Sequence, residues 1–233
     1  VPGDAPESIG SGPTVGDPST LEDCWRILEK HDLTDRIPAS IIDHLSQERA
    51  ETPKPDDPLF SRVLYRIVAR NADAVGTARD RAQELGLKAV SGDRFVTGDV
   101  KDVASQWARA KKEVASPLPK PCLLVSGGEP TVTVTGSGKG GRNTELALRV
   151  ATQLEGKFTF VSAGTDGTDG PTDAAGAFSD ETTRLRAREA GLNPEDFLKR
   201  NDSYSFFKQL GDLLITGPTG TNVMDLEMLL VWD

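Results

Sequence analysis

Short apolar segments of strand length alternate with helical patterns from residue 63 onward, and this alternation constrains the fold more than any other feature of the chain. The expected strands span residues 63–68, 88–90, 122–125, 131–135, 158–162, 213–216 and 225–231. The expected helices span residues 71–85, 99–114, 143–154, 180–190, 194–199 and 203–210. This order predicts an α/β fold in which helices cover both faces of a largely parallel or mixed sheet.

The first sixty residues have a different character. Residues 1–20 are rich in Gly, Pro, Ser and Asp and are expected to form loops. A helix is expected to begin after Ser19 and Thr20, both good N-cap residues, and a second one to cover residues 38–45. The proline-rich stretch 50–58 interrupts both patterns, so we expect a linker there.

Composition excludes several classes of protein. Hydrophobic residues make up 36% of the 233 residues and the formal net charge is -9, which fits an acidic globular protein. Without a basic stretch, nucleic acid and anionic membranes are disfavoured as partners. Cys24 and Cys122 form neither a zinc motif nor a disulfide framework, which favours a reducing, cytoplasmic setting. No segment resembles a signal peptide, and the start at Val1 indicates part of a larger polypeptide.

Four of the expected strands end in glycine-rich polar loops. These loops span residues 126–130, 136–143, 163–173 and 217–222. In an open α/β sheet, ligands bind outside the carboxyl ends of the strands, so we expect the loops to carry the chemistry. Glycines allow backbone amides to approach an anion closely, and a following helix adds the partial positive charge of its N-terminus.

The loop at 136–141 has this form, and Arg142 at its end could clamp a carboxylate or a phosphate with two donors. The alternative is a flexible hairpin tip with an exposed arginine. Gly136, Gly138 and Gly141 also match a dinucleotide-binding pattern, but the preceding segment alternates polar and apolar residues instead of being fully apolar. A Walker A site is excluded because Lys139 is followed by glycine.

Acidic residues mark two of the loops. Asp166, Asp169 and Asp173 offer hard oxygen donors, and Asp166 lies nearest to a strand end. Asp166 is therefore the candidate for holding magnesium or for orienting a substrate hydroxyl. Asp169 and Asp173 are expected to cap the next helix instead. Glu129 could hold a cation or a ribose hydroxyl, or cap local amides.

Taken together, four long segments resemble the class II glycerate kinase family, which includes members labelled as hydroxypyruvate reductases. The segments are residues 1–20, 126–148, 162–177 and 201–226. The resemblance implies ATP-dependent phosphorylation of D-glycerate to 2-phosphoglycerate, with magnesium, in a cleft between two α/β domains. It also implies that residues 1–59 are the remnant of the N-terminal domain. Residues 60–233 would then be the C-terminal domain, with the MOFRL segment at 121–233.

The resemblance assigns roles to residues of the loops. The family's active-site arginine falls on Arg142, and the expected catalytic residues are Arg142, Asp166 and Asp4, with Asp166 also a magnesium ligand. The residues expected to bind substrate or phosphate are Ser126, Gly127, Gly128, Glu129, Gly140, Gly141, Asn143, Thr165, Gly217, Thr219 and Asn222.

Two other functions stay open at this point. Members of the family are considerably longer at the N-terminus, so the 233-residue chain is expected to be inactive alone. It could instead serve as a binding or assembly module that pairs with another copy. An NAD(P)H-dependent hydroxypyruvate reductase is the remaining alternative, as some family labels suggest.

Overall fold

The computed structural model describes residues 1–92 and 95–233, which form two compact units, Gly3–Val68 and Ala69–Asp233. The first unit contains α1 (Leu21–Lys30) and α2 (Ala39–Leu45), joined by turns and short 3-10 segments. Thr20 begins α1 with a reciprocal cap, in which its hydroxyl accepts from the Asp23 amide and the Asp23 carboxylate accepts from the Thr20 amide. Both expected helices are therefore confirmed.

The prediction of a strand at residues 63–68 is wrong. Residues 1–68 form no strand in the structure, and Leu64 and Val68 are 85% and 90% exposed. An apolar segment becomes a strand only when a neighbouring strand pairs with its backbone and a core covers its side chains. This segment has neither, so β-propensity alone does not decide its conformation.

The second unit is built on a six-stranded mixed sheet, which confirms the mixed form of the expected architecture. Its strands are β1 (Lys88–Ser91), β2 (Cys122–Gly128), β3 (Phe158–Gly164), β4 (Gly176–Asp180), β5 (Leu213–Leu214) and β6 (Asp225–Val231). Their order is β1-β2-β6-β3-β4-β5, with β1 and β2 parallel and the other four pairs antiparallel. Consequently β1, β2, β3 and β5 run in one direction, and their carboxyl ends lie at one edge of the sheet.

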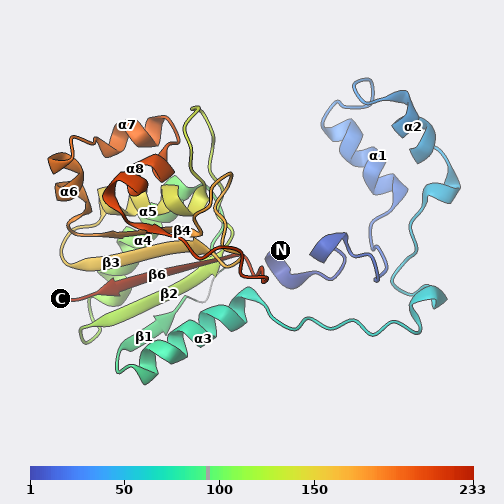
Figure 1. Ribbon diagram of the computed structural model, residues 1–233. Coiled ribbons are helices and arrows are strands. Elements are labelled where there is room, and N and C mark those ends of the chain that lie inside the picture. The colour runs from blue at the N-terminus through green and yellow to red at the C-terminus, as the bar shows by residue number, and fades with distance from the viewer. Residues whose placement is uncertain (93–94) are drawn as a thin grey trace. The chain divides into compact units, whose positions relative to one another are not determined.

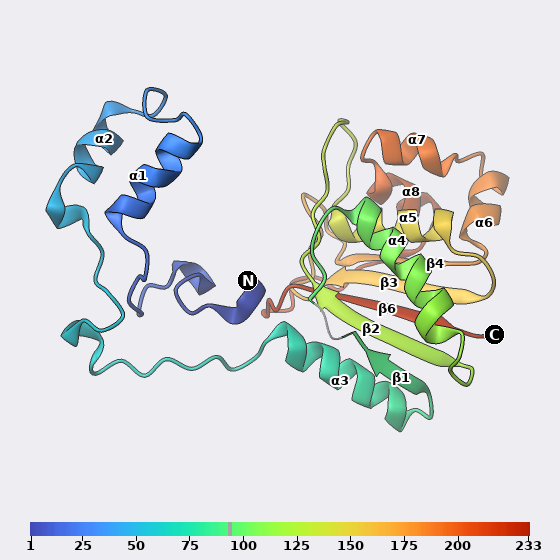
Figure 2. The same ribbon diagram turned by 180° about the vertical axis from the view of Figure 1, so that it is seen from behind.

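Helices cover the sheet as two outer layers, as Figures 1 and 2 show. The helices of this unit are α3 (Asn71–Glu84), α4 (Val100–Ala110), α5 (Arg142–Gln153), α6 (Thr183–Glu189), α7 (Pro194–Lys199) and α8 (Ser203–Leu210). The larger core lies between the sheet and α4 to α8, where Phe160, Leu146 and Leu229 are fully buried. A smaller core lies under α3, where Val75 packs with Val125.

Side chains on the larger-core face change from apolar to polar along the central strands β2, β6 and β3. The in-register rows are Cys122, Val231 and Phe158; then Leu124, Leu229 and Phe160; then Ser126, Glu227 and Ser162; then Gly128, Asp225 and Gly164. The two apolar rows belong to the core. The two polar rows lie at the edge where the carboxyl ends of β2 and β3 gather, so this edge is where a site can form.

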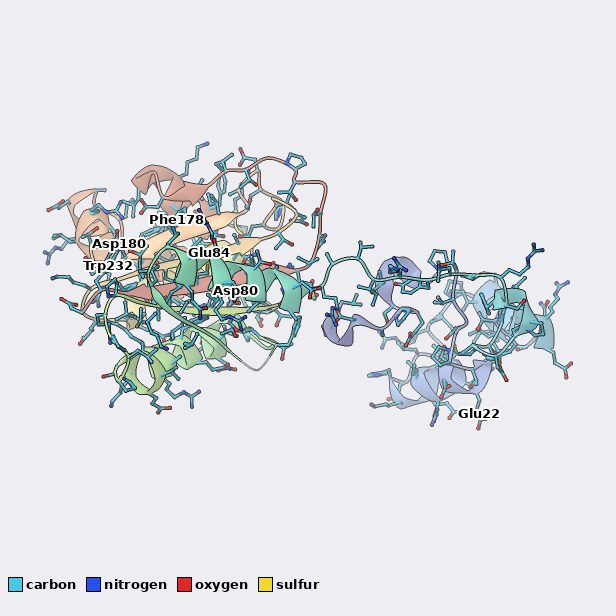
Figure 3. All side chains as sticks on the ribbon, turned by 90° about the horizontal axis from the view of Figure 1, so that it is seen from below. Glu22, Asp80, Glu84, Phe178, Asp180 and Trp232 are labelled. Atoms are coloured by element: carbon cyan, nitrogen blue, oxygen red, sulfur yellow. The ribbon has the colours of Figure 1, made fainter. Side chains whose placement is uncertain are left out.

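Helix α3 covers only part of the sheet face on which it packs. Figure 3 labels Phe178 and Trp232 together with Asp80 and Glu84 of α3. Phe178, on β4, pairs with Val161 of β3 and is 41% exposed. Trp232 is 48% exposed.

No helix of the described residues is long and apolar enough to serve as a membrane span.

Two further expectations differ from the structure. The segment 131–135 is not a strand, although Thr131 makes a single bridge to Asp99. Its end is held by a side chain instead, because the Asn201 carboxamide oxygen accepts from the amides of Thr135 and Gly136. Strand β4 was not expected, because Gly176–Asp180 is short and directly follows a glycine-rich and proline-rich loop.

Candidate functional site

Arg142 and Asp225 form the central contact at the glycine-rich edge of the sheet. Arg142 Nε donates to Asp225 Oδ2 at 2.5 Å and Nη2 donates to Oδ1 at 2.9 Å, which makes the contact bidentate. The Asp225 side chain is fully buried, whereas the Arg142 side chain is 34% exposed. Hydrogen bonding to Asp225 raises the pKa of Arg142, so the guanidinium stays charged.

The backbone around this pair explains why it forms here. Asp225 begins β6 and lies between Gly128 of β2 and Gly164 of β3, which have no side chains. A Cβ on Gly164 would lie 3.6 Å from Asp225 Oδ1 and 2.6 Å from the Thr168 carbonyl oxygen. The Asn71 side-chain amide donates to the Asp225 carbonyl at 2.9 Å and fixes this end of β6.

Glu129 adds a second carboxylate beside Arg142. Its Oε1 lies 3.6 Å from Arg142 Nη1. The two-pronged contact expected with a ligand is thus made with Asp225 in this structure. Nη1 of Arg142 lies on the side of Glu129, whose side chain is 39% exposed.

The N-terminus of α5 is occupied by the protein's own carboxylate. Asp169 is 1% exposed and accepts from the amides of Asn143 at 2.9 Å and Thr144 at 2.8 Å, and from the Thr144 hydroxyl at 2.8 Å. Burial raises the pKa of Asp169, and these hydrogen bonds oppose that rise. Asp169 is a cap, as expected, but it caps α5, which precedes it, and not the next helix. An external anion would have to displace it.

The glycine-rich loop at 136–141 packs against the start of α8. The Gly138 amide donates to the Arg200 carbonyl at 2.8 Å, and the Lys139 amide donates to Asp202 at 3.0 Å. A Cβ on Gly140 would lie 2.4 Å from Ser203 Oγ, and one on Gly141 would lie 2.3 Å from Asp169 Oδ1. These glycines allow close packing, so the loop is not a flexible tip, and phosphate binding by Gly140 and Gly141 stays a prediction.

The loops at 165–168 and 217–224 form one connected structure. The Thr165 hydroxyl donates to the Met224 carbonyl at 2.6 Å and accepts from the Val223 amide at 2.8 Å. The Thr219 hydroxyl donates to the Thr165 carbonyl at 2.6 Å, and the Thr219 amide donates to the Asp166 carbonyl at 3.1 Å. Gly164 joins this structure to Asp225 through its register in the sheet. Arg142, Asp166 and Thr219 therefore lie at one edge of the sheet.

Asp166 has one engaged and one more open carboxylate oxygen. Oδ1 accepts from the Thr168 amide at 2.9 Å and from the Thr168 hydroxyl at 3.0 Å. Oδ2 lies 3.5 Å from the Asn222 side-chain nitrogen, which is a long hydrogen bond. A Cβ on the neighbouring Gly164 would lie 3.1 Å from Oδ1, which places Asp166 beside the Asp225 row.

Replacing Gly167 with alanine is expected to separate the two loops. Gly167 has φ +90°, and a Cβ there would lie 2.1 Å from the Gly217 carbonyl oxygen. Strain and overlap together predict a loss of about 2–4 kcal/mol in the free energy of unfolding. Gly76→Ala is the matched control, because this helical glycine has open space around it and should stabilise by about 0.5–1 kcal/mol. Urea denaturation of both variants measures the difference, and equal stabilities would contradict the described contact.

Other predicted site residues belong to the sheet, to α5 or to the first unit. Ser126, Gly127 and Gly128 belong to β2 and pair with β6, so they are part of the sheet and not of a loop. Asn143 is fully buried, and its Oδ1 accepts from the Ser162 hydroxyl at 2.6 Å. Asp4 lies in a 3-10 turn of the first unit, with φ +53°.

Three residues that the sequence did not single out hold the site together. They are Asn71, Asp225 and Glu227. Asp225 and Glu227 alternate with apolar residues in β6, which reads as an ordinary strand with one polar face. A pair of carboxylates on the face that must be buried was the signal that could have identified them, because such groups are almost never buried without partners.

Within the described ranges, no three or more His, Cys, Asp or Glu side chains are arranged to hold a metal ion. Asp166 therefore offers a single carboxylate that is not part of such a cluster. A single carboxylate fits a magnesium ion whose other ligands are phosphate oxygens and water molecules. Proteins commonly bind Mg²⁺ in this way.

Comparison with known proteins places this edge in a family. The model described as the MOFRL family matches residues 122–225, and a domain of unknown function (DUF4147) matches residues 1–46. The chain is 41% identical over 240 residues to the glycerate 2-kinase of Pyrococcus horikoshii and covers 99% of itself and 54% of that protein. The crystal structure of a glycerate kinase from Thermotoga maritima superposes with a TM-score of 0.83 at 40% identity, covering 99% of this chain and 55% of that chain.

The chain belongs to the glycerate kinase family. It spans about half the length of these two relatives. A family relative from Agrobacterium vitis, called a putative hydroxypyruvate reductase, is 38% identical over 238 residues, with 99% of this chain and 53% of that protein covered. The family resemblance stated from the sequence is confirmed.

Proposed function

We propose that this chain supplies one side of a glycerate kinase site, at which the γ-phosphoryl group of ATP is transferred to D-glycerate to give 2-phosphoglycerate. The observation that carries the proposal is the gathering of Arg142, Glu129, Asp166 and Thr219 at one sheet edge, in a chain about 40% identical to glycerate kinases. Phosphoryl transfer depends mainly on positioning and on neutralising charge, and this edge offers a fixed cation for that purpose.

Arg142 is the group proposed to contact the reacting anion. Asp225 holds two of its nitrogens, so the orientation of the guanidinium is set before a ligand binds. Nη1 then faces an incoming carboxylate or phosphoryl oxygen. Glu129 lies on the same side and would accept a hydrogen bond from a hydroxyl group of glycerate, because an ionised carboxylate accepts hydrogen bonds only.

Asp166 is the residue proposed to hold magnesium. When bound, magnesium would neutralise charge on the phosphate groups of ATP. Asp166 Oδ2 is the donor that the structure leaves with the weaker contact, at 3.5 Å from Asn222. The bonds from Thr168 to Oδ1 keep the carboxylate oriented whether or not the ion is present.

An assay of the 233-residue chain with ATP, Mg²⁺ and D-glycerate tests how much of the site it contains. Formation of 2-phosphoglycerate is measured against a full-length relative. We expect no turnover by this chain, because it spans about half of such a relative. Turnover at the rate of the relative would contradict the proposal that the chain supplies one side of the site only.

Arg142→Lys should lower turnover at least about a hundredfold in a full-length family member that carries this sequence. Lysine keeps the charge but cannot hold Asp225 with two nitrogens and still present a third, and loss of one such donor costs about 3 kcal/mol in the transition state. Steady-state kinetics measures the change, with Arg81→Lys on the exposed side of α3 as control. Near-normal turnover would remove Arg142 from the mechanism.

The reductase alternative rests on the name of the Agrobacterium vitis relative. A full-length protein that oxidises NAD(P)H in the presence of hydroxypyruvate, and does not phosphorylate glycerate, would favour it. Loss of nicotinamide absorbance is the measurement. The fold offers this alternative less support, because Gly136 and Gly138 of the dinucleotide-like pattern pack against residues 200–202 and Gly141 packs against Asp169.

A further inference from the structure

A cavity of about 620 Å³ lies between α4 and the sheet, at the carboxyl ends of β1 and β2. This volume is within the range of about 300–1,000 Å³ that is usual for small-molecule sites. The apolar part of its lining includes Val90, Val96, Val103, Trp107, Ala110 and Leu124. A β1-α4-β2 unit with parallel strands is the arrangement in which ligands bind at the carboxyl ends of strands.

The polar groups of the cavity are neutral. They come from the side chains of Ser91, Gln106 and Ser126, together with Thr97. None of the described lining residues carries a charge. Burying a phosphate here would be costly without a partner cation, whereas a flat heterocycle with donors and acceptors on its edge would find matching groups.

One wall of the cavity is rigidly fixed. The Trp107 indole N–H donates to Glu227 Oε2 at 2.6 Å inside the sheet, which sets the orientation of the ring. Ser126 is the register partner of Glu227 and lies next to this wall. A Cβ on Gly92 would lie 3.3 Å from Ser126 Oγ, so glycine leaves space in front of that hydroxyl. A preorganised aromatic wall lowers the entropy lost when a ring packs against it.

One backbone hydrogen bond links a lining residue of the cavity to the site around Arg142. Val96 lines the cavity, and its carbonyl accepts from the Glu129 amide at 2.9 Å. The Glu129 carboxylate in turn lies 3.6 Å from Arg142 Nη1. A ligand with a neutral ring in the cavity and an anionic tail at the cation would match both ends of this path.

We propose that the cavity binds the adenine ring of ATP, with the triphosphate extending past Val96 and Glu129 toward Arg142. Trp107 and Val103 pack against the ring, and the Gln106 carboxamide hydrogen-bonds its edge, since a carboxamide can donate and accept at adenine simultaneously. This inference rests on the proposed kinase function, because that function places the transferred phosphoryl group at Arg142.

The test uses adenosine, which has no phosphate and therefore reports on the ring site alone. In the 233-residue chain carrying Trp25→Phe and Trp232→Phe, Trp107 is the remaining tryptophan of the three. Titration with adenosine should change its fluorescence in a saturable way. Gln106→Leu should weaken adenosine binding about tenfold. Ala110→Leu, which fills the cavity, should weaken it at least tenfold. Tripolyphosphate should not displace adenosine.

Ala108→Leu is the matched control. It makes the same substitution on the same helix but faces a different cavity, which is lined by Lys111 and Gln153. Its dissociation constant for adenosine should stay within twofold of the parent. Circular dichroism checks the folding of each variant. If Ala110→Leu does not fold, the adenosine affinity of Gln106→Leu, at an exposed position, tests the adenine site.

Three results would overturn the adenine site. They are no saturable change with adenosine, displacement of adenosine by tripolyphosphate, and unchanged binding in a folded Gln106→Leu or Ala110→Leu variant. The proposed function fails separately. If a full-length protein binds adenosine but does not phosphorylate glycerate, the adenine site is supported and the kinase function is contradicted. If it phosphorylates glycerate and these substitutions do not change the rate, only the adenine site is contradicted.

Discussion

The Glu227 carboxyl group is expected to lower the free energy of unfolding of the unit Ala69–Asp233 by roughly 1 kcal/mol per pH unit as the pH rises from roughly 5 to 8, because this group is buried. Burial raises the pKa of Glu227 from 4.5 to about 8, against the opposing effect of the hydrogen bond from Trp107. The folded state therefore holds a proton that the unfolded state has released. The stabilising effect is complete below about pH 4.5 and is lost as the pH rises through about 8.

Glu227→Gln should remove most of this slope. Glutamine keeps the size of the side chain and an oxygen that can accept from Trp107, but it cannot ionise. Urea denaturation at several pH values, followed by tryptophan fluorescence in a Trp25→Phe background, measures the difference between parent and variant. Glu84→Gln is the control, because that glutamate is an exposed partner of Arg81. A parent and a Glu227→Gln variant with the same pH dependence would show that Glu227 does not hold the proton.

The second large effect concerns Arg142 and the carboxylate buried behind it. Arg142→Ala should lower the free energy of unfolding by about 2–4 kcal/mol, because Asp225 would remain buried without its cation. The lower part of this range allows for water that enters where the partly exposed arginine was. Adding Asp225→Asn should recover at least half of the loss, because the second substitution removes the uncompensated charge.

Chemical denaturation of the two single variants and the double variant measures this coupling. Arg81→Ala serves as a control, since its partner Glu84 is well exposed and such pairs contribute at most about 1 kcal/mol. An Arg142→Ala variant as stable as the parent would mean that Asp225 finds another partner. In that case the orientation of Arg142 would not depend on this contact either.

Local signals account for the parts of the fold that the sequence predicted well. Helix α7 begins at Pro194, with the Asn193 side chain accepting from the Glu195 amide, and α8 ends before Gly211 at φ +77°. Caps and positive-φ glycines act over a few residues, so they can be identified without knowing the neighbours in space. The same holds for β6, whose alternating pattern is visible in the sequence.

The remaining differences depend on contacts between distant segments. The loop at 136–141 looks like an anion site because of its glycines, yet those glycines allow residues 200–203 to approach. Asp169 caps a helix that begins 27 residues before it at Arg142, a pairing that local patterns do not encode. The sequence predicted Arg142 and Asp166 at the same edge for a general reason. Loops that follow strands running in the same direction lie at one edge of the sheet. Their catalytic roles stay predictions.

The position of β6 has a consequence for how the molecule forms. This strand comes latest along the sequence among the described strands, yet it lies between β2 and β3 in the middle of the sheet. A chain emerging from the ribosome therefore cannot complete its sheet until residues 225–231 have left the exit tunnel, and until then β2 and β3 expose unpaired backbone edges. Truncation before Asp225 would remove the strand that joins the two halves, so nascent chains stalled there should be captured by chaperones or degraded.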